Sequence, residues 1–170
     1  MAEFENQENN ADNDLLITQL CESHSIAHQE NPELINFLAL IFLKFRKNDF
    51  HSANERLGHY ITWRRQIFGN LSEQSLENNE HLRNQIQSLF LTVLPNSMPN
   101  GEGILYLELR RHNTSIYSAE DTLKTWHYLI MRALRKDPEL AKSGFYVTGN
   151  LTNISYYNLD IQIPHAVTHA

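Results

Sequence analysis

The histidines are the residues whose type and spacing could most readily carry chemistry. The chain has nine of them, and two pairs, His24 with His28 and His165 with His169, lie four residues apart. On a helix this spacing places both rings on one face. Neither pair encloses the glutamate of a zinc-peptidase helix, and no third ligand stands at a suitable spacing. We therefore expect surface histidines and no metal site.

Other reactive side chains also lack the context that catalysis needs. Glu120 and Asp121 are adjacent carboxylates, but they lie at a predicted helix start, where the helix dipole accounts for them. The Gly-Glu-Gly at 101–103 lacks the third glycine of a dinucleotide fingerprint and precedes a strand instead of following one. Cys21 is the single cysteine, which excludes an internal disulfide and a Cys-rich zinc site. The expectation is a protein that is not an enzyme and needs no cofactor.

Composition and charge narrow the class of protein further. Of the 170 residues, 41% are hydrophobic and 20% are charged, which is typical of a globular chain with a core. The net charge of −6 disfavours nucleic acid as a partner, because phosphate binding needs a basic face. Residues 1–14 are acidic and rich in asparagine, without lysine or arginine, and predict a disordered tail instead of a signal peptide. The cytoplasm is the expected compartment.

The first half of the chain has the pattern of helices. Apolar spacing predicts a short helix over 15–29. Asn31 can cap the next one, Pro32 suits its first position, and apolar residues recur at helical spacing as far as residue 45. A capping box of Ser52 and Glu55 predicts a third helix, which Gly69 ends. A fourth helix is expected over 82–89.

The second half changes character after residue 90. A short apolar run at 91–94 is followed by a turn at 99–101 and by a predicted strand at 104–109. A capping box of Ser118 and Asp121 opens a helix, and a second strand is expected at 145–148. Strand, helix and strand in this order predict a parallel pair joined by a crossover. The expected class is α/β at the back and α+β overall, with a small sheet that keeps an exposed edge.

A basic cluster and the apolar stripes each allow two interpretations. Lys44, Arg46 and Lys47 lie where a helix ends, so they either compensate its dipole or contact anionic lipid at a membrane surface. The apolar stripes of the predicted helices either fill a core or line a ligand cavity, because both use the same residue types.

Three segments resemble the CRAL-TRIO family of lipid-binding and lipid-transfer proteins. Residues 42–65, FLKFRKNDFHSANERLGHYITWRR, are similar to its N-terminal helical module, with lysine at 44 and phenylalanine at 45 as departures. Residues 103–126 and 137–155 resemble its first lipid-domain strand, the following helix start and the approach to the next strand. Asn150 and Asn153 stand where the family usually has an aspartate and then a glycine. Ile163-Pro164 stands where a further helix would begin.

The resemblance implies a helical module, 15–90, followed by an incomplete CRAL-TRIO-like α/β lipid-binding domain, 91–170. It implies binding and intermembrane transfer of one hydrophobic molecule, a retinoid, a tocopherol-like compound or a phosphoinositide, through transient membrane contact. Members of the tocopherol and retinaldehyde carrier subgroup are the most similar. The family domain continues beyond the length of this chain, so we expect a truncated domain with impaired ligand retention. The expected pocket wall consists of Leu105, Leu107, Leu109, Trp126, Ile130, Leu134 and Val147.

A second function stays open beside lipid transfer. The small sheet with an exposed edge and an exposed apolar face could instead serve a protein-protein interaction module without lipid transfer.

Overall fold

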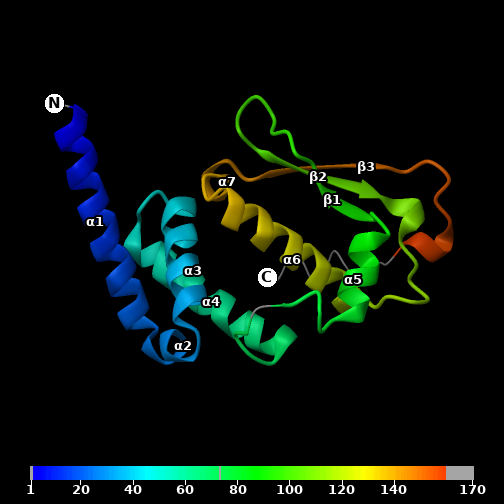
Figure 1. Ribbon diagram of the computed structural model, residues 1–170, viewed down its shortest axis with the longest axis horizontal. Coiled ribbons are helices and arrows are strands. Elements are labelled where there is room, and N and C mark those ends of the chain that lie inside the picture. Colours follow the sequence, from blue (N-terminus) through cyan, green and yellow to red (C-terminus); the bar gives the residue numbers. More distant parts are fainter. Residues whose placement is uncertain (1, 73, 160–170) are drawn as a thin grey trace. The chain divides into compact units, whose positions relative to one another are not determined.

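The computed structural model describes residues 2–72 and 74–159, with side chains from residue 12 onward (Figure 1). The chain divides into two units, Met1–Glu73 and Gln74–Ala170. The described part of the first unit consists of helices joined by short turns, and the second combines helices with a three-stranded sheet. This arrangement confirms the predicted α+β class. Within the described ranges, no helix combines the length and the apolar character that crossing a bilayer requires.

Among its described residues, the first unit has four helices, and α3 lies at its centre. In chain order they are α1 (Ala2–Ser23), α2 (Ser25–Glu30), α3 (Pro32–Phe45) and α4 (Phe50–Phe68). The mostly apolar sequence of α3 explains its central place, because α1, α2 and α4 all pack against it. The core consists chiefly of Leu20, Leu34, Ile35, Leu38, Leu57 and Ile61.

The N-terminal prediction was wrong in two respects. Residues 2–14, expected as a disordered tail, are the beginning of α1. Once the packed end of α1 at Leu20 has formed a helix, each further residue gains one hydrogen bond for the two dihedral angles it fixes, so the helix extends without a second nucleation cost. The single helix expected over 15–29 is instead broken at His24, whose backbone leaves the helical region with φ −116° and ψ 39°.

The helix ends of this unit follow from local chemistry. Asn31 caps α3 by accepting a hydrogen bond from the Leu34 amide at 3.0 Å. The cap of α4 is Asp49 and not the predicted Ser52, because the Asp49 carboxylate accepts from both the amide and the hydroxyl of Ser52, at 3.2 and 2.7 Å. Gly69 ends α4 with φ +77°, as predicted.

The second unit is built on a mixed sheet. Its elements are α5 (Glu80–Gln87), β1 (Leu91–Val93), β2 (Gly103–Glu108), the 3-10 helix η1 (Leu109–Arg111), α6 (Ala119–Lys136), α7 (Leu140–Ser143), β3 (Phe145–Asn150) and the 3-10 helix η2 (Tyr156–Asn158). The strand order is β1-β2-β3. β1 and β2 form an antiparallel hairpin, whereas β2 and β3 are parallel, which confirms the predicted parallel pair.

The boundary predicted at residue 90 was wrong, because α5 belongs to the sheet unit. The Gln85 amide on α5 is buried and donates to the Thr122 hydroxyl on α6 at 3.2 Å, and its carbonyl accepts from the Thr125 hydroxyl. A buried polar group stays favourable only when it is hydrogen-bonded, so these contacts fix α5 against α6. The helical unit therefore ends near residue 73.

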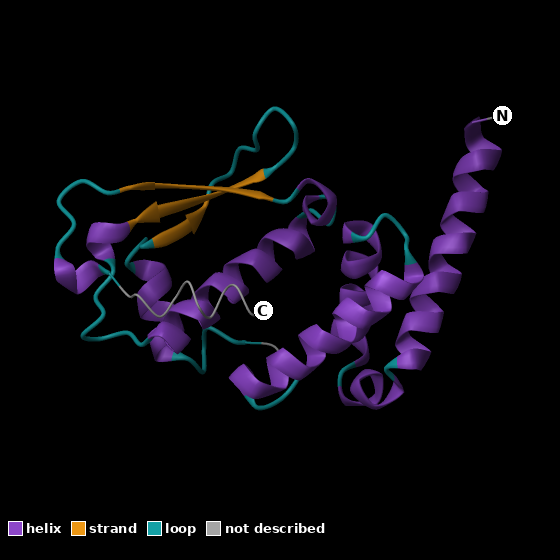
Figure 2. Cartoon of the chain, turned by 180° about the vertical axis from the view of Figure 1, so that it is seen from behind, coloured by secondary structure: helices purple, strands orange, loops and turns teal. Residues whose placement is uncertain are grey.

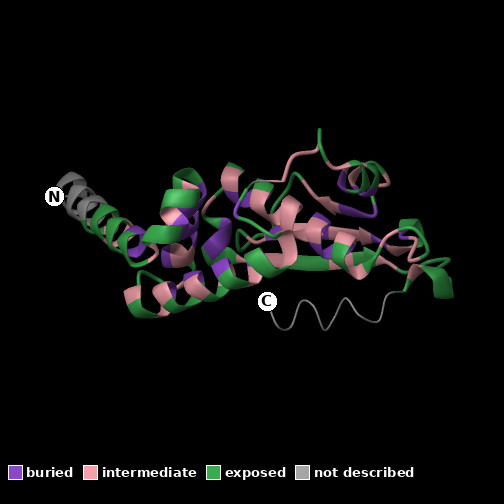
Figure 3. Ribbon diagram, turned by 90° about the horizontal axis from the view of Figure 1, so that it is seen from below, coloured by how far each residue is buried: buried purple, intermediate pink, exposed green. Residues whose placement is uncertain are grey.

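The core of the second unit lies between the sheet and its helices, which cover one face of the sheet (Figure 2). Phe90, Leu91 and Leu105 are buried at its centre. β3 lies at the edge and has no buried residue along its length (Figure 3). The segments that hold Ile163-Pro164, His165 and His169 lie outside the described residues.

Candidate ligand-binding site

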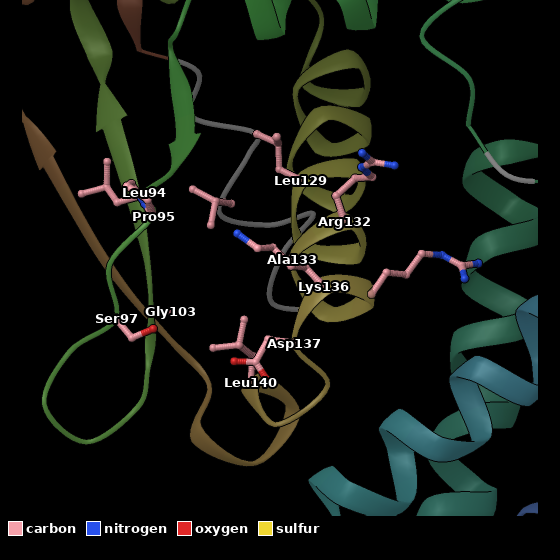
Figure 4. A pocket seen from close by; sticks show the side chains of 12 residues that line it. Leu94, Pro95, Ser97, Gly103, Leu129, Arg132, Ala133, Lys136, Asp137 and Leu140 are labelled. Carbon is pink, nitrogen blue, oxygen red and sulfur yellow. The ribbon is translucent and has the colours of Figure 1, made fainter.

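A half-open cavity of about 650 Å³ lies between the β1–β2 hairpin and the C-terminal half of α6. Figure 4 shows its lining residues. They come from the end of β1 and the loop after it, from the start of β2, from α6, and from the turn into α7. The lining residues are Val93, Leu94, Pro95, Ser97, Gly103, Leu129, Arg132, Ala133, Arg135, Lys136, Asp137 and Leu140.

Local sequence explains how these elements frame the cavity. Pro95 is the second residue after the short β1, where the chain leaves the sheet. Gly101, with φ +88°, turns the loop back, and its amide donates to the Met98 carbonyl at 2.9 Å. At Gly103, a Cβ atom would lie 2.8 Å from the ring of Phe145 and 3.3 Å from Leu140. Glycine is therefore required there for the sheet and α7 to close one end of the cavity.

The cavity combines an apolar wall with positive charge. Leu94, Leu129 and Leu140 supply apolar surface. Lys136 extends from α6 toward the strands (Figure 4). It belongs to the last turn of α6, where the negative end of the helix dipole also favours a cation. Asp137 lies beside it and carries a negative charge, with one carboxylate oxygen accepting from the Glu139 amide at 3.0 Å. The lining also includes Arg132 and Arg135, so positive charge predominates. Such a site suits a molecule with an apolar body and an acidic head.

The residues predicted to form the pocket wall are distributed differently. Leu105 is a central core residue, and four others pack against that core: Leu107, Leu109, Trp126 and Ile130. Leu134 is buried on α6, whereas Val147 is 47% exposed on β3. Leu109 is also not a strand residue, because it opens η1. None of the seven lines the described cavity.

The cavity residues on α6 were missed because they occupy the neighbouring face of the helix. Leu129, Ala133 and Lys136 follow each other at spacings of four and three, the same spacing that the core stripe has. The spacing alone could have identified this second stripe. The spacing could not show that β1 ends opposite this stripe of α6. Because β1 ends there, no strand residue fills the space that forms the cavity.

The basic cluster predicted for membrane contact lies at the end of α3, in the first unit. Lys44 is in the last turn, and Lys47 lies in the turn beyond with φ +53°. The Arg46 guanidinium lies over the ring of Phe45, 4.9 Å from its centre, and Phe45 is 54% exposed. An exposed aromatic ring beside cations is the combination that favours the interface of an anionic membrane.

The segment 42–65, the first of the three that carry the resemblance, forms the last turn of α3 and most of α4 and is held by aromatic packing. Phe42 contacts Tyr60 and Tyr60 contacts Trp63, each with ring centres 5.7 Å apart. Arg64 is buried and donates to the Tyr60 hydroxyl at 3.2 Å and to the Ser72 carbonyl at 2.8 Å. Burial raises the pKa of Tyr60 above its ordinary value. These residues have a packing role in the structure.

A buried carboxylate on β2 is also accounted for by protein partners. Glu108 forms an ion pair with Arg110 at 2.8 Å and accepts from the Tyr106 hydroxyl at 3.2 Å. The Asn150 amide donates to it at 3.3 Å. A carboxylate at position 150 would repel Glu108 at this distance, which explains an asparagine there. Asn153 has φ +59°, a conformation that glycine adopts readily and asparagine tolerates.

Two further predictions concern reactive groups. In the described part of the chain, no group of three or more His, Cys, Asp or Glu side chains is placed to hold a metal ion. The His24 Nε2 atom lies 3.2 Å from the Asn54 carbonyl oxygen on the neighbouring helix α4.

Cys21, the single cysteine, is buried and donates to the Asn36 side-chain oxygen at 3.0 Å, and burial raises the pKa of its thiol. A thiol with a raised pKa is a poor nucleophile.

Comparison with known proteins adds no assignment. No protein-family model matches the chain, and no curated protein matches it.

Proposed function

We propose that this chain binds one amphiphilic molecule, with a long apolar body and an acidic head, and exchanges it with membranes. The observation that carries the proposal is the cavity beside α6, in which Lys136 faces an apolar wall. A lipid in this space would remove apolar surface from water, at roughly 25 cal/mol per Å². The positive charge at the cavity favours a carboxylate or phosphate head, as in an acidic retinoid or a phosphoinositide, over a neutral alcohol.

The resemblance to CRAL-TRIO lipid carriers supports the same function. In residues 137–155, the sequence differs from the usual family pattern at two positions, and both residues fit the local geometry. Asn153 occupies a glycine-like conformation where the family usually has glycine, and Asn150 satisfies a buried carboxylate that an aspartate would repel. Membership of that family is part of the proposal.

Binding can be tested with a fluorescent fatty acid, dansyl-undecanoic acid, titrated into the purified chain. We expect saturable binding to one site. Lys136→Glu should weaken binding about tenfold or more, because it replaces an attractive charge by a repulsive one. Leu94→Trp should weaken it independently, by filling apolar space without changing charge.

Arg56→Glu is the matched control for charge. Arg56 is exposed on α4 in the first unit, so this variant has the same change in net charge as Lys136→Glu but leaves the cavity intact. Binding that is absent in the native chain, or equally weak in Lys136→Glu and Arg56→Glu, would reject the cavity as the ligand site.

Membrane contact, which exchange requires, is tested by flotation with vesicles. We expect the chain to bind vesicles that contain about a third anionic lipid and not neutral ones. Changing Lys44, Arg46 and Lys47 to glutamate should abolish binding, and Phe45→Ser should weaken it because it removes the exposed ring beside them. If flotation is unchanged in the triple variant, the basic cluster is not the membrane contact.

A further inference from the structure

The outer edge of β3 offers backbone groups for pairing. β3 pairs with β2 on one side only, and it is the last strand of the described sheet. The Gly103 amide donates to the Gly144 carbonyl at 3.0 Å, and Gly103 stands opposite Phe145. In a parallel ladder this directs the amides and carbonyls of Phe145, Val147 and Gly149 away from β2.

Among the described residues, this edge lacks the charged and proline residues that usually keep sheet edges apart. Its sequence, FYVTGN, contains no charged residue and no proline. Tyr146 and Val147 are 51% and 47% exposed, on opposite faces of the strand. Natural proteins protect such edges with lysine, proline, bulges or a covering element, because an open edge is a template for another strand.

The sequence of β3 is complementary to itself in one antiparallel register. If Val147 stands opposite Val147 of a second copy, Phe145 stands opposite Gly149 and Tyr146 opposite Thr148. Phe145, Val147 and Gly149, whose backbone groups point away from β2, then all occupy hydrogen-bonded positions. In such a position, two opposite residues exchange two backbone hydrogen bonds. The absence of charge means that two identical strands meet without repulsion.

The cross-strand side chains favour this register too. Gly149 cannot become larger, because a Cβ there would lie 2.9 Å from Leu107. The ring of Phe145 packs over Gly103 and the core of its own chain, so the Phe145–Gly149 pair places no bulky side chain between the two strands. Tyr146 opposite Thr148 is an aromatic and β-branched pair, a combination that stabilises sheets.

We propose that two copies of this chain pair through β3 about a twofold axis at Val147, which joins their sheets into one. The proposal is independent of the ligand-binding function, since β3 contributes no residue to the cavity lining. The contact is a single short strand, so the buried area lies at the low end for protein interfaces and the dimer is reversible. Its dissociation constant is expected on the order of micromolar or weaker.

Sedimentation equilibrium of the whole chain tests the proposal. The mass should be near the monomer value of 19.8 kDa in dilute solution and approach twice that value with rising concentration. Val147→Lys and Val147→Glu should each remain monomeric, because each places like charges opposite one another. An equimolar mixture of the two variants should recover the dimer, because lysine then faces glutamate.

Ile116→Lys is the control, because it adds a charge to an exposed position of the same unit away from β3. It should dimerise like the native chain. Circular dichroism must show that the Val147 variants keep their fold, as expected for a half-exposed edge residue. A native chain that stays monomeric at all concentrations overturns the proposal, as does a Val147→Lys variant that still dimerises. If the mixture remains monomeric, the register at Val147 is wrong.

Discussion

Arg64 is the largest fully buried side chain in the part of the chain that the structure describes. Its guanidinium hydrogen-bonds to Tyr60 and Ser72 and lies 5.0 Å from the ring centre of Phe68. Removing it leaves a void and exposes polar partners to an apolar surrounding. We expect Arg64→Ala to lower the free energy of unfolding by about 2–4 kcal/mol, since hydrogen bonds to charged groups contribute most when buried. Urea unfolding followed by circular dichroism measures the change.

The neighbouring Arg65 is the matched control. It pairs with Glu30 at 2.8 Å, but both side chains are more than a third exposed. Exposed ion pairs contribute little, so Arg65→Ala should cost less than about 1 kcal/mol. Equal losses for the two variants would contradict the assigned role of Arg64.

Glu30 makes the first unit sensitive to acid. Its pKa is lowered, first by the hydrogen bond from Arg65 and then by the one from the Leu71 amide. A carboxyl group whose pKa is lower in the folded state stabilises the fold above its ordinary pKa of 4.5. That contribution is lost as the pH falls through the lowered value. Glu30→Gln should therefore reduce the loss of melting temperature between pH 5 and pH 3, measured by thermal denaturation. An unchanged acid profile would show that Glu30 has no such role.

At the scale of the element, the start of α6 is the clearest case of a local signal. The Ser118 hydroxyl accepts from the Asp121 amide at 3.1 Å, and the Asp121 carboxylate accepts from the Ser118 amide at 3.0 Å. Ser118→Ala should destabilise the second unit by about 1 kcal/mol, because the Asp121 amide loses its acceptor and the Asp121 carboxylate loses the hydroxyl as a donor. Ser115→Ala, in the exposed loop before it, should have no measurable effect in the same urea titration. Similar losses from both would mean that the cap is not what stabilises this helix start.

The accuracy of the sequence-based prediction depended on the range of the interactions. The caps at Asn31 and Ser118 were predicted correctly because each depends on residues three positions away. The parallel strands also followed from element order. The position of α5 did not, since it depends on Gln85 meeting Thr122, 37 residues later.

The candidate site could be predicted only in part for the same reason. Sequence spacing identified α6 as a helix with an apolar stripe, and that stripe fills the core through Trp126 and Ile130. The cavity lies on the next face, beside Lys136, and exists because β1 ends at Val93. The spacing of residues within one helix does not predict where a strand that packs against it ends.

At the scale of the whole molecule, the division near residue 73 separates the two proposed activities. The basic cluster and Phe45 belong to the helical unit, whereas the cavity beside α6 and the edge of β3 belong to the sheet unit. Each unit has a core of its own, centred on Leu38 in the first and on Leu105 in the second. A unit with its own core can fold alone.

We therefore expect residues 1–73 and residues 74–170 to fold when they are produced separately. Their circular dichroism spectra, weighted by length, should add up to that of the intact chain. The helical piece should keep the binding to anionic vesicles, and the sheet piece should keep the binding of dansyl-undecanoic acid with an affinity within about threefold of the intact chain, a difference below about 1 kcal/mol. Two folded pieces that have both lost binding would show that the activities need both units together. An unfolded piece would show that its core is not sufficient, which contradicts the independence argued from Leu38 and Leu105.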